Sequence, residues 1–585
     1  MDGAPKISAF LDVEASLSGR RWVGPAAGVQ RAADALAQRA DLPGPVAQVL
    51  ARRGIAPEDA AAFLAPALRD LLPDPRSLRD MEAAAQRLNA AVARRERVAI
   101  FADYDVDGGS SAALLIDWLR AQGRRATLYV PDRIDEGYGP NPEAISALAA
   151  DHDLILCVDC GTLSHEALAA GTAADVVVLD HHLGAETLPD VLAVVNPNRQ
   201  DEDGALAHLC AAAVVFLCLV EAGRQLRTAG TQGPDLMAML DLVALATVAD
   251  VAPLVGVNRA FVRQGLRVMA RRDRLGLAAL ADVARLDTAP SAYHLGYVLG
   301  PRINAGGRIG QADLGARLLS TADPHEAAAL AERLNTLNTE RREVEAAVRA
   351  AALTQAEERG LEAPLAWAAG PGWHPGVVGI VASRLKEVSN RPSIVIGVEN
   401  GIGKGSGRSV SGIDLGAPIQ RLAAEGLLIK GGGHKMAAGL TVAEEMIAPA
   451  MARLSDLLAR QGADRMGPAD LRIDGIMMPG AATPELIESV EAAGPFGAGA
   501  PGPRFAFADM QIFHARILGG THLKISFGDT SGPRLDAIAF SAMDGPLAAL
   551  HDHKGRRFHL AGRVEINSWQ GRRSAQLRLE DAAPA

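Results

Sequence analysis

The chain has few cysteines, few aromatic residues and no excess of positive charge. Four cysteines occur among 585 residues, which is too few for a disulfide scaffold and suits a reducing compartment. The net charge of −10 gives no global sign of nucleic-acid binding, so such a site would have to be a local basic groove. Hydrophobic residues make up 49% and charged residues 22% of the chain, and its length predicts three or four globular domains.

The sequence also lacks the apolar runs that a membrane protein requires. No uninterrupted apolar stretch approaches the ~20 residues of a membrane-spanning helix. Residues 1–22 contain no basic segment followed by an apolar core, so no signal peptide is evident. We therefore expect a cytoplasmic protein without a membrane segment.

An acidic motif, Asp103-Tyr104-Asp105-Val106-Asp107-Gly108, directly follows an apolar run at 98–101. Carboxylates this close raise one another's pKa unless cations neutralise them. Oxygen ligands favour Mg²⁺ or Mn²⁺. An EF-hand loop would need Glu at its twelfth position, where this chain has Leu114. Taken alone, the motif predicts a metal site, with a solvated acidic turn as the alternative.

From Arg97 onward, apolar runs alternate with helix-like stretches. The first runs lie at 98–101, 126–130, 154–158, 176–179 and 192–195. This rhythm is typical of βαβ units and a parallel sheet. A second α/β pattern begins near Ala363. Beyond residue 468, short alternating runs separated by Gly, Asp and Pro predict a small β-barrel or sandwich.

The fold class that we predict is α/β, with two α/β domains joined by a helical connector and followed by a C-terminal β-barrel of the OB type. The expected parts are a mainly helical N-terminal extension at 1–90, a parallel-sheet domain at 91–320, the connector at 321–360, a smaller α/β domain at 361–467 and the barrel at 468–585.

Acidic residues and histidines follow three of the predicted strands. The run at 154–158 leads to Asp159, and the run at 176–179 leads to Asp180, His181 and His182. Because ligands bind beyond the carboxyl ends of strands in open α/β sheets, we expect these groups to meet the acidic motif at one edge. A helix N-cap would explain one such aspartate but not the set. Asp250 ends another apolar stretch and is expected at the same edge.

Four motifs in this order, D-Y-D-V-D-G, V-D-C-G, D-H-H and T-V-A-D, resemble those of the DHH phosphoesterase superfamily. The later G-G-G-H at 431–434 resembles the companion DHHA1 domain. Segments at 300–308, 373–384, 406–409 and 494–497 are similar to the RecJ exonuclease branch. The resemblance covers nearly the whole chain.

The resemblance implies a metal-dependent 5′→3′ exonuclease that degrades single-stranded DNA to nucleoside 5′-monophosphates in DNA repair and recombination. It implies two divalent cations, Mn²⁺ or Mg²⁺, as cofactors. Expected partners are single-stranded DNA, a single-strand-binding protein and a helicase, and we expect a monomer.

Two divalent ions can clamp the attacking and leaving oxygens of a phosphodiester. The predicted metal ligands are Asp103, Asp105, Asp107, Asp159, His181 and Asp250. The superfamily's V-D motif implies that Asp159 bridges the ions. The predicted catalytic residues are His182, Asp180 and Asp159. Asp180 would orient a histidine, and His182 would contact the scissile phosphate or a metal-bound water, with a structural role for His182 as the alternative.

Residues of the later motifs are predicted to bind substrate phosphates: Arg302, Arg308, His374, Arg408, Ser409, Gly432, Gly433 and His434. Arginine suits bidentate phosphate contacts, and glycines allow backbone N–H groups to approach an anion. For G-G-G-H alone, the signal is weak and a tight turn is at least as good an interpretation.

The β-rich tail favours a polymeric substrate, because OB barrels hold single strands by stacking bases on aromatic rings. Phe505, Phe527, Phe540 and Trp569 are candidates, although we expect most of the phenylalanines in the core. Two alternatives remain. A DHH phosphodiesterase acting on short oligonucleotides or cyclic dinucleotides generally lacks such a tail, and a non-catalytic DNA-binding scaffold should have lost acidic ligands that this chain retains.

Overall fold

The computed structural model describes residues 9–132, 136–467, 469–569 and 572–585, which form two compact units. The first unit consists of Met1–Ala67, Gly467–Phe496 and Ala500–Ala585, and the second of Leu68–Met466 and Gly497–Gly499. Residues 1–8 of the predicted extension, and 468 and 570–571 of the predicted barrel, lie outside the described residues.

The second unit begins with a five-stranded parallel sheet in the order β3-β2-β4-β5-β6. Its strands are β2 (Val98–Ala102), β3 (Ala126–Tyr129), β4 (Leu154–Val158), β5 (Asp175–Leu179) and β6 (Ala193–Val195). The central strands β2 and β4 are apolar and buried throughout, as expected for strands covered on both faces. The predicted parallel sheet is confirmed.

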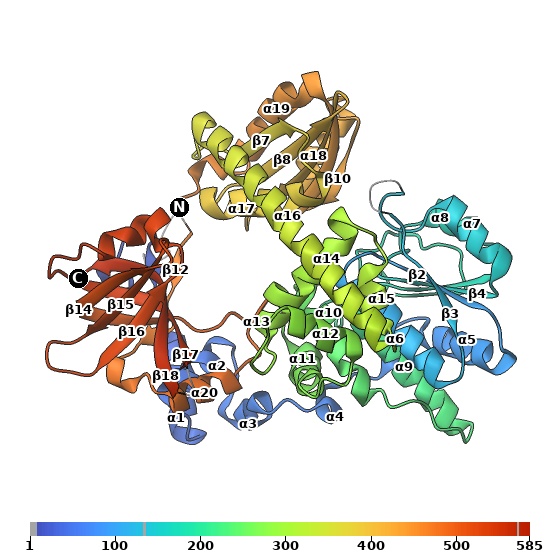
Figure 1. Cartoon of the computed structure of the whole chain (residues 1–585), viewed down its shortest axis with the longest axis horizontal. Coiled ribbons are helices and arrows are strands. Elements are labelled where there is room, and N and C mark those ends of the chain that lie inside the picture. The colour runs from blue at the N-terminus through green and yellow to red at the C-terminus, as the bar shows by residue number, and fades with distance from the viewer. Residues whose placement is uncertain (1–8, 133–135, 468, 570–571) are drawn as a thin grey trace. The chain divides into compact units, whose positions relative to one another are not determined.

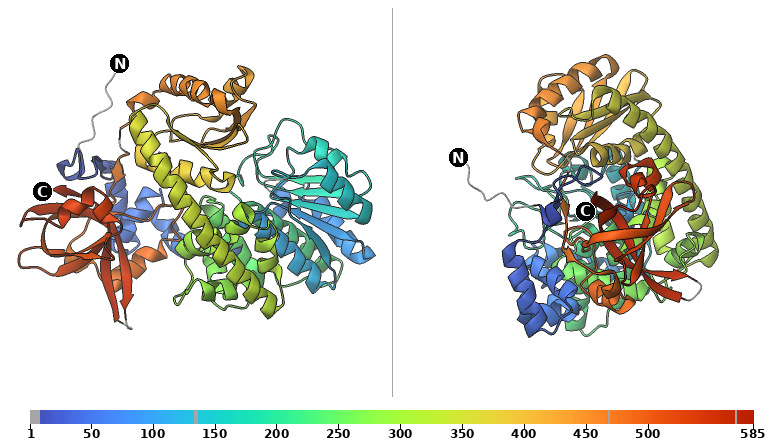
Figure 2. Two further views of the ribbon diagram at one scale, coloured as in Figure 1. Left: turned by 45° about the horizontal axis from the view of Figure 1, so that its top comes forward. Right: turned by 90° about the vertical axis from the view of Figure 1, so that its left-hand side faces the viewer.

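Helices cover both faces of this sheet (Figure 2). On one face, α7 (Pro142–Asp151) and α8 (His165–Ala169) pack on alternate strand residues such as Phe101 and Ile155. The opposite face carries α5 (Met81–Arg94), α6 (Val106–Ala121) and α9 (Ala211–Thr228). This doubly wound arrangement leaves the carboxyl ends of the strands for polar residues.

A helical region follows, comprising α10 (Leu240–Ala249), α11 (Gly256–Met269), α12 (Leu275–Val283), α14 (Gly300–Ile309) and α15 (Leu314–Ser320). The long helix α16 (Pro324–Arg359) then leads from α12 and α14 to the next sheet (Figure 1). Asp323 caps its first turn by accepting the N–H of His325. The predicted helical connector is therefore confirmed.

The second sheet of this unit is mixed, in the order β10-β11-β9-β8-β7, and only β7 and β8 are parallel. Its strands are β7 (Ala366–Pro371), β8 (Ser393–Glu399), β9 (Ile402–Arg408), β10 (Lys430–His434) and β11 (Ala437–Ala443). The helices α17 (Pro375–Ser389), α18 (Gly416–Ala424) and α19 (Ile447–Ala459) pack on it.

The tight-turn interpretation of G-G-G-H is wrong, because these residues form edge strand β10, paired with β11. Gly433 has φ of 147°, and a Cβ there would lie 2.4 Å from the carbonyl oxygen of Ala437. This position therefore requires glycine, whereas a Cβ on Gly432 would meet nothing within 4 Å.

The first unit contains a five-stranded barrel, which confirms the predicted OB-type domain. Its strands are β14 (Phe505–Leu518), β15 (His522–Gly528), β16 (Arg534–Ala539), β17 (Arg557–Trp569) and β18 (Arg572–Pro584). The sheet closes because β14 pairs with both β15 and β17. Phe505 and Phe527 are buried in the core, whereas Phe540 is 51% exposed. The side chain of Trp569 lies outside the described part.

Amino-terminal elements belong to the same unit as the barrel. The helices α1 (Ala27–Arg39) and α2 (Gly44–Arg52) share an apolar cluster with α20 (Pro484–Ala492). Strand β1 (Trp22–Val23) pairs with β12 (Leu471–Arg472). Within the described ranges, no helix combines the length and apolar character needed to cross a bilayer.

Candidate metal centre

The carboxyl ends of β2, β4 and β5 bring acidic residues and histidines together, and the end of α10 adds Asp250. Three overlapping groups have ligand atoms within 4.8 Å of one another: Asp103, Asp105 and Asp159; Asp107, His181 and Asp250; and Asp159, His181 and His182. We call the residues of these three groups the metal centre. All six predicted metal ligands lie in it.

The loop after β2 is held by the carboxylate of Asp105 and by the amide of Asn304. Asp105 Oδ1 caps α6 by accepting the N–H groups of Asp107 (2.8 Å) and Gly108 (3.1 Å). The N–H of Val106 donates to Asn304 Oδ1 on α14 at 2.9 Å. A Cβ on Gly108 would lie 2.4 Å from the carbonyl oxygen of Asp103, so the loop can close only with glycine there.

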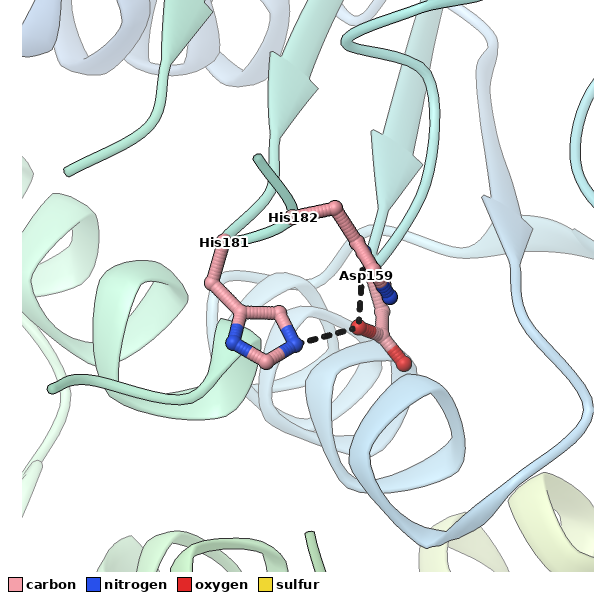
Figure 3. A group of neighbouring side chains, drawn as sticks. All are labelled: Asp159, His181 and His182. Carbon is pink, nitrogen blue, oxygen red and sulfur yellow. Dashed lines mark ion pairs between the residues drawn. The ribbon is translucent and has the colours of Figure 1, made fainter. Parts of the chain in front are cut away.

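Asp159 is the most central acid of the group. Its side chain is buried, and its Oδ1 accepts no hydrogen bond from the described residues. That oxygen lies 3.3 Å from His181 Nε2 and 3.9 Å from His182 Nδ1 (Figure 3). The backbone of Asp159 has φ of 60°, a strained conformation of the kind that clusters at functional sites. A buried carboxylate oxygen aimed at other ligand atoms fits a cation.

Asp107 and Asp250 flank His181. The carboxylate of Asp107 accepts the N–H groups of Ala211 (2.7 Å) and Ala212 (2.8 Å) at the start of α9. His181 Nε2 lies 3.7 Å from Asp107 Oδ2, and its Nδ1 lies 3.9 Å from Asp250 Oδ2. Helix dipole and backbone donors thus fix Asp107, while an oxygen of each acid still faces the imidazole.

Burial and mutual repulsion make this group of acids hard to ionise together. Burial raises the pKa of Asp159 well above its usual range, and the charges of Asp107, Asp105 and Asp103 raise it further. Burial, followed by the charges of Asp107 and Asp105, raises the pKa of Asp250 to about 8. Burial likewise raises the pKa of Asp107. Positive charge placed among them would favour the ionised forms, which is the electrostatic signature of a cation site.

Asp180 orients the two histidines. Its Oδ1 lies 2.8 Å from His182 Nδ1 and accepts the backbone N–H of His181 at 2.7 Å. Its Oδ2 accepts the hydroxyl of Thr162 at 2.6 Å. Burial alone would raise the pKa of Asp180, but the bonds from His182 and Thr162 outweigh it and lower the pKa. Burial lowers the pKa of His182, and Asp180 outweighs that effect and raises it to about 9.

Sequence reasoning missed several residues that support this site. Asn196 Nδ2 donates to Thr162 Oγ1 and to the carbonyl oxygen of His182, both at 2.8 Å. The hydroxyl of Tyr138 donates to the carbonyl oxygen of Asp159 at 3.1 Å. Asn304 could have been suspected, because it stands inside the motif at 300–308. Thr162 and Asn196 carry no motif of their own.

The predicted substrate residues Arg302 and Arg308 lie on α14. This helix contacts the loop after β2 that carries Asp103 and Asp105, through the bond between Val106 and Asn304. Arg302 Nε donates to Asn335 Oδ1 on α16 at 3.1 Å, and its Nη1 donates to the carbonyl oxygen of Val298 at 2.7 Å. Arg308 Nη1 donates to the carbonyl oxygen of Gly376 at 3.1 Å. A continuous set of contacts therefore joins the acidic loop, α14 and the start of α17.

The remaining predicted substrate residues lie on the second sheet and at the start of α17. His374 caps α17, with its Nδ1 accepting the N–H of Gly376. Arg408 ends β9 and bonds Ser406 Oγ. The hydroxyl of Ser409 donates to the carbonyl oxygen of Ile413 at 2.7 Å, so it can offer a ligand only an acceptor. His434 ends β10 and is exposed, beside Gly432 and Gly433. This second set therefore belongs to a different sheet from the strand ends that form the metal centre.

Comparison with known proteins finds three family models along the chain. The DHH family N-terminal domain matches residues 97–247, the DHHA1 domain 362–460 and the RecJ OB domain 473–581. The single-stranded-DNA-specific exonuclease RecJ of Dickeya dadantii is 38% identical over 541 residues, covering 88% of this chain and 92% of that protein.

Two solved structures of RecJ from Thermus thermophilus are also similar. The complex with Mn²⁺ has 29% identity and a TM-score of 0.79, covering 96% of this chain and 79% of that one. The complex with Mg²⁺ has 28% identity and a TM-score of 0.73, covering 96% and 78%.

Proposed function

Because the chain belongs to the RecJ family of single-stranded-DNA-specific exonucleases, we propose that it removes nucleotides from the 5′ end of single-stranded DNA and releases nucleoside 5′-monophosphates. The observation that carries this proposal is the convergence of carboxylates and imidazoles into three overlapping groups. Phosphodiester hydrolysis needs such a donor set to hold divalent cations against the reacting phosphate.

The residues of the metal centre fit Mn²⁺ or Mg²⁺. Carboxylate oxygens with an added imidazole suit these hard cations, and the buried Oδ1 of Asp159 lacks a hydrogen bond within the described chain. We assign one ion to Asp103, Asp105 and Asp159 and a second to Asp107, His181 and Asp250. Asp159, which also belongs to the group with His181 and His182, would bridge them. When bound, two divalent cations neutralise phosphate charge and activate water.

His182 is the residue that we place against the scissile phosphate. Asp180 fixes the ring through Nδ1, and Nε2 lies 3.1 Å from the Tyr138 hydroxyl oxygen, a contact that a phosphate oxygen would replace when substrate binds. Asp180 itself is tied to Thr162 and to two backbone N–H groups, so the imidazole is oriented before substrate arrives. We therefore assign Asp180 an orienting role and His182 a direct contact.

The substrate's terminal phosphates would be held by Arg302, Arg308, His374, Arg408, Gly432, Gly433 and His434, whereas the buried Ser409 would brace the loop after β9 through its bond to Ile413. The exposure of His434 and the open space beside Gly432 support this assignment, because an anion can approach both. Such a grip on the 5′ end would allow only the first phosphodiester to meet the cations, which is what an exonuclease requires.

The barrel of the first unit would hold the rest of the strand. Phe540 is exposed, the edge of His522 meets its ring with centroids 5.3 Å apart, and the guanidinium of Arg578 lies 5.4 Å from the ring centroid. Aromatic rings beside arginine suit stacked bases and phosphates. A RecJ OB domain also favours a polymer over the small substrates of other DHH phosphodiesterases. The same proposal includes roles in DNA repair and recombination. It also includes a single-strand-binding protein and a helicase as partners, a cytoplasmic location and a monomeric state.

The test is degradation of labelled oligonucleotides. A 5′-labelled single strand should yield labelled mononucleotide as the first product in Mn²⁺ or Mg²⁺, and none in chelator. A 3′-labelled strand should shorten stepwise, and a blunt duplex should be cut poorly. Internal cleavage of the 3′-labelled strand, equal rates on blunt duplex, or full activity in chelator would contradict the proposal.

A further inference from the structure

Three exposed apolar side chains lie on the loops that carry the metal centre. Tyr138 is 55% exposed, Leu163 57% and Leu183 66%. They stand on the loops that follow β3, β4 and β5, beyond the carboxyl ends of the strands. We call these three residues the apolar rim. Single exposed apolar residues are common on proteins, but three on adjacent active-site loops mark a surface for an apolar ligand group.

One residue of the apolar rim contacts His182, and the other two adjoin the catalytic residues in the chain. The Tyr138 oxygen lies 3.1 Å from His182 Nε2, and the two rings meet edge to face with centroids 5.6 Å apart. Leu183 directly follows His182 in the chain, and Leu163 directly follows Thr162, which bonds Asp180. The loop of Tyr138 also lies against the loop of Leu163, because a Cβ on Gly139 would be 3.8 Å from Ser164 Oγ.

The polar groups behind the apolar rim are bonded to one another. Thr162 donates to Asp180 and accepts from Asn196, and Asn198 Nδ2 donates to the carbonyl oxygen of His181 at 2.6 Å. The loops after β4 and β5 are therefore held in place without a ligand, and their exposed leucines are available to one. Such preorganisation lowers the entropic cost of binding.

We propose that the apolar rim receives the base of the 5′-terminal nucleotide while the phosphate that follows it lies against His182. This inference rests on the proposed exonuclease function and names a determinant of substrate placement within it. A phosphate at His182 has its nucleoside next to it along the strand, where the exposed ring of Tyr138 contacts His182 and the exposed Leu183 follows it in the chain. Tyrosine and leucine side chains offer every base the same kind of contact, so the rim would hold the end without selecting its sequence.

The experiment combines a change in the substrate with a change in the protein. Single strands that are normal, abasic at the 5′-terminal nucleotide or abasic at the fifth nucleotide are cut in Mn²⁺, and kcat/KM is measured for release of the first nucleotide. The wild-type protein should lose roughly ten-fold when the terminal base is absent, the size of one stacking contact. The strand abasic at the fifth position should be cut like the normal one.

For the variants Tyr138→Ser and Leu183→Ser, kcat/KM on the normal strand should fall to the value that the wild type shows on the terminally abasic strand. Each variant should cut the normal and the terminally abasic strand with the same kcat/KM. Leu163→Ser is a second, independent test should either variant fold poorly. Tyr138→Phe keeps the ring and should keep the discrimination. Leu192→Ser is the matched control, because Leu192 is exposed just before β6, at the opposite edge of the sheet.

Melting temperature and Mn²⁺ affinity should be unchanged in the leucine variants, which separates this role from a structural one. Equal cutting of normal and terminally abasic strands by the wild type, or full discrimination retained by the folded serine variants, would overturn the inference. Failure of the wild type to release mononucleotides from the normal strand would instead overturn the exonuclease function itself.

Discussion

The metal centre and the glycine-rich strand β10 differ in how firmly their functional groups are held. Asp107, Asp159 and Asp180 are buried, and Asp107 and Asp180 each accept several hydrogen bonds. His434 at the end of β10 is exposed, and its Nδ1 accepts the N–H of Met436 at 3.3 Å. The difference teaches that cation binding depends on a buried hydrogen-bonded network, whereas the substrate contact assigned to His434 uses an exposed side chain that can be removed without disturbing that network.

The largest expected effect is in the metal centre. Asp159→Asn keeps the shape of the side chain but removes the charge that both ions would share. We expect turnover to fall by roughly 10³- to 10⁴-fold, as for loss of a central group in other hydrolases, and Mn²⁺ affinity to fall with it. Calorimetric Mn²⁺ titration and single-strand degradation would measure both. Asp190→Asn, an exposed acid of the same domain, is the control. Near-normal turnover of Asp159→Asn would refute the bridging role.

On β10, His434→Ala should lower turnover by roughly 10²-fold, the effect of losing one preorganised donor to a charged oxygen. Mn²⁺ affinity and melting temperature should stay as in the wild type, because His434 is not an assigned ligand and is exposed. Lys430→Ala, at the other exposed end of the same strand, controls for general damage. A drop in the Mn²⁺ affinity of His434→Ala would contradict the claim that the metal centre and β10 act separately.

Two neighbouring glycines sharpen the comparison within β10. Gly433→Ala should destabilise the protein by about 1–3 kcal/mol, because φ of 147° is strained for alanine and its Cβ would clash with Ala437. Gly432→Ala should leave the melting temperature unchanged, because open space surrounds that Cβ. If Gly432 approaches a phosphate, its alanine variant should still lose activity on DNA. Full activity would remove Gly432 from the substrate site.

Measured per pH unit, the smallest effect is a pH dependence of cation binding. The pKa of Asp250 is raised to about 8 in the folded protein, from an unfolded value of about 3.9. Its protonated form therefore contributes stability that is fully present below about pH 4 and lost as pH rises through 8. Mn²⁺ must displace that proton, so affinity should rise up to about ten-fold per pH unit for each proton released. The Mn²⁺-induced rise in melting temperature should grow from about pH 5 to 8, and a flat profile would contradict this.

The sequence allowed prediction of the parallel sheet and of the acidic residues at its edge. Apolar strands followed by Asp159 or Asp180 indicate that metal-binding side chains lie at the carboxyl ends of the strands. It could not reveal the partners that are distant in the chain. Val106 meets Asn304 across 198 positions, and Asp107 meets the start of α9 across 104. The strand nature of G-G-G-H was also hidden, because glycine favours turns and only pairing with β11 decides the conformation.

The most direct test of the account is to locate the cations in the protein itself. Crystals grown with Mn²⁺ should show two anomalous peaks about 3.5–4 Å apart, one among Asp103, Asp105 and Asp159 and the other among Asp107, His181 and Asp250. The same measurement on Asp159→Asn should show loss of one or both peaks. Absence of manganese from this edge of the sheet in the wild-type protein, under conditions in which it degrades single strands, would contradict the central claim.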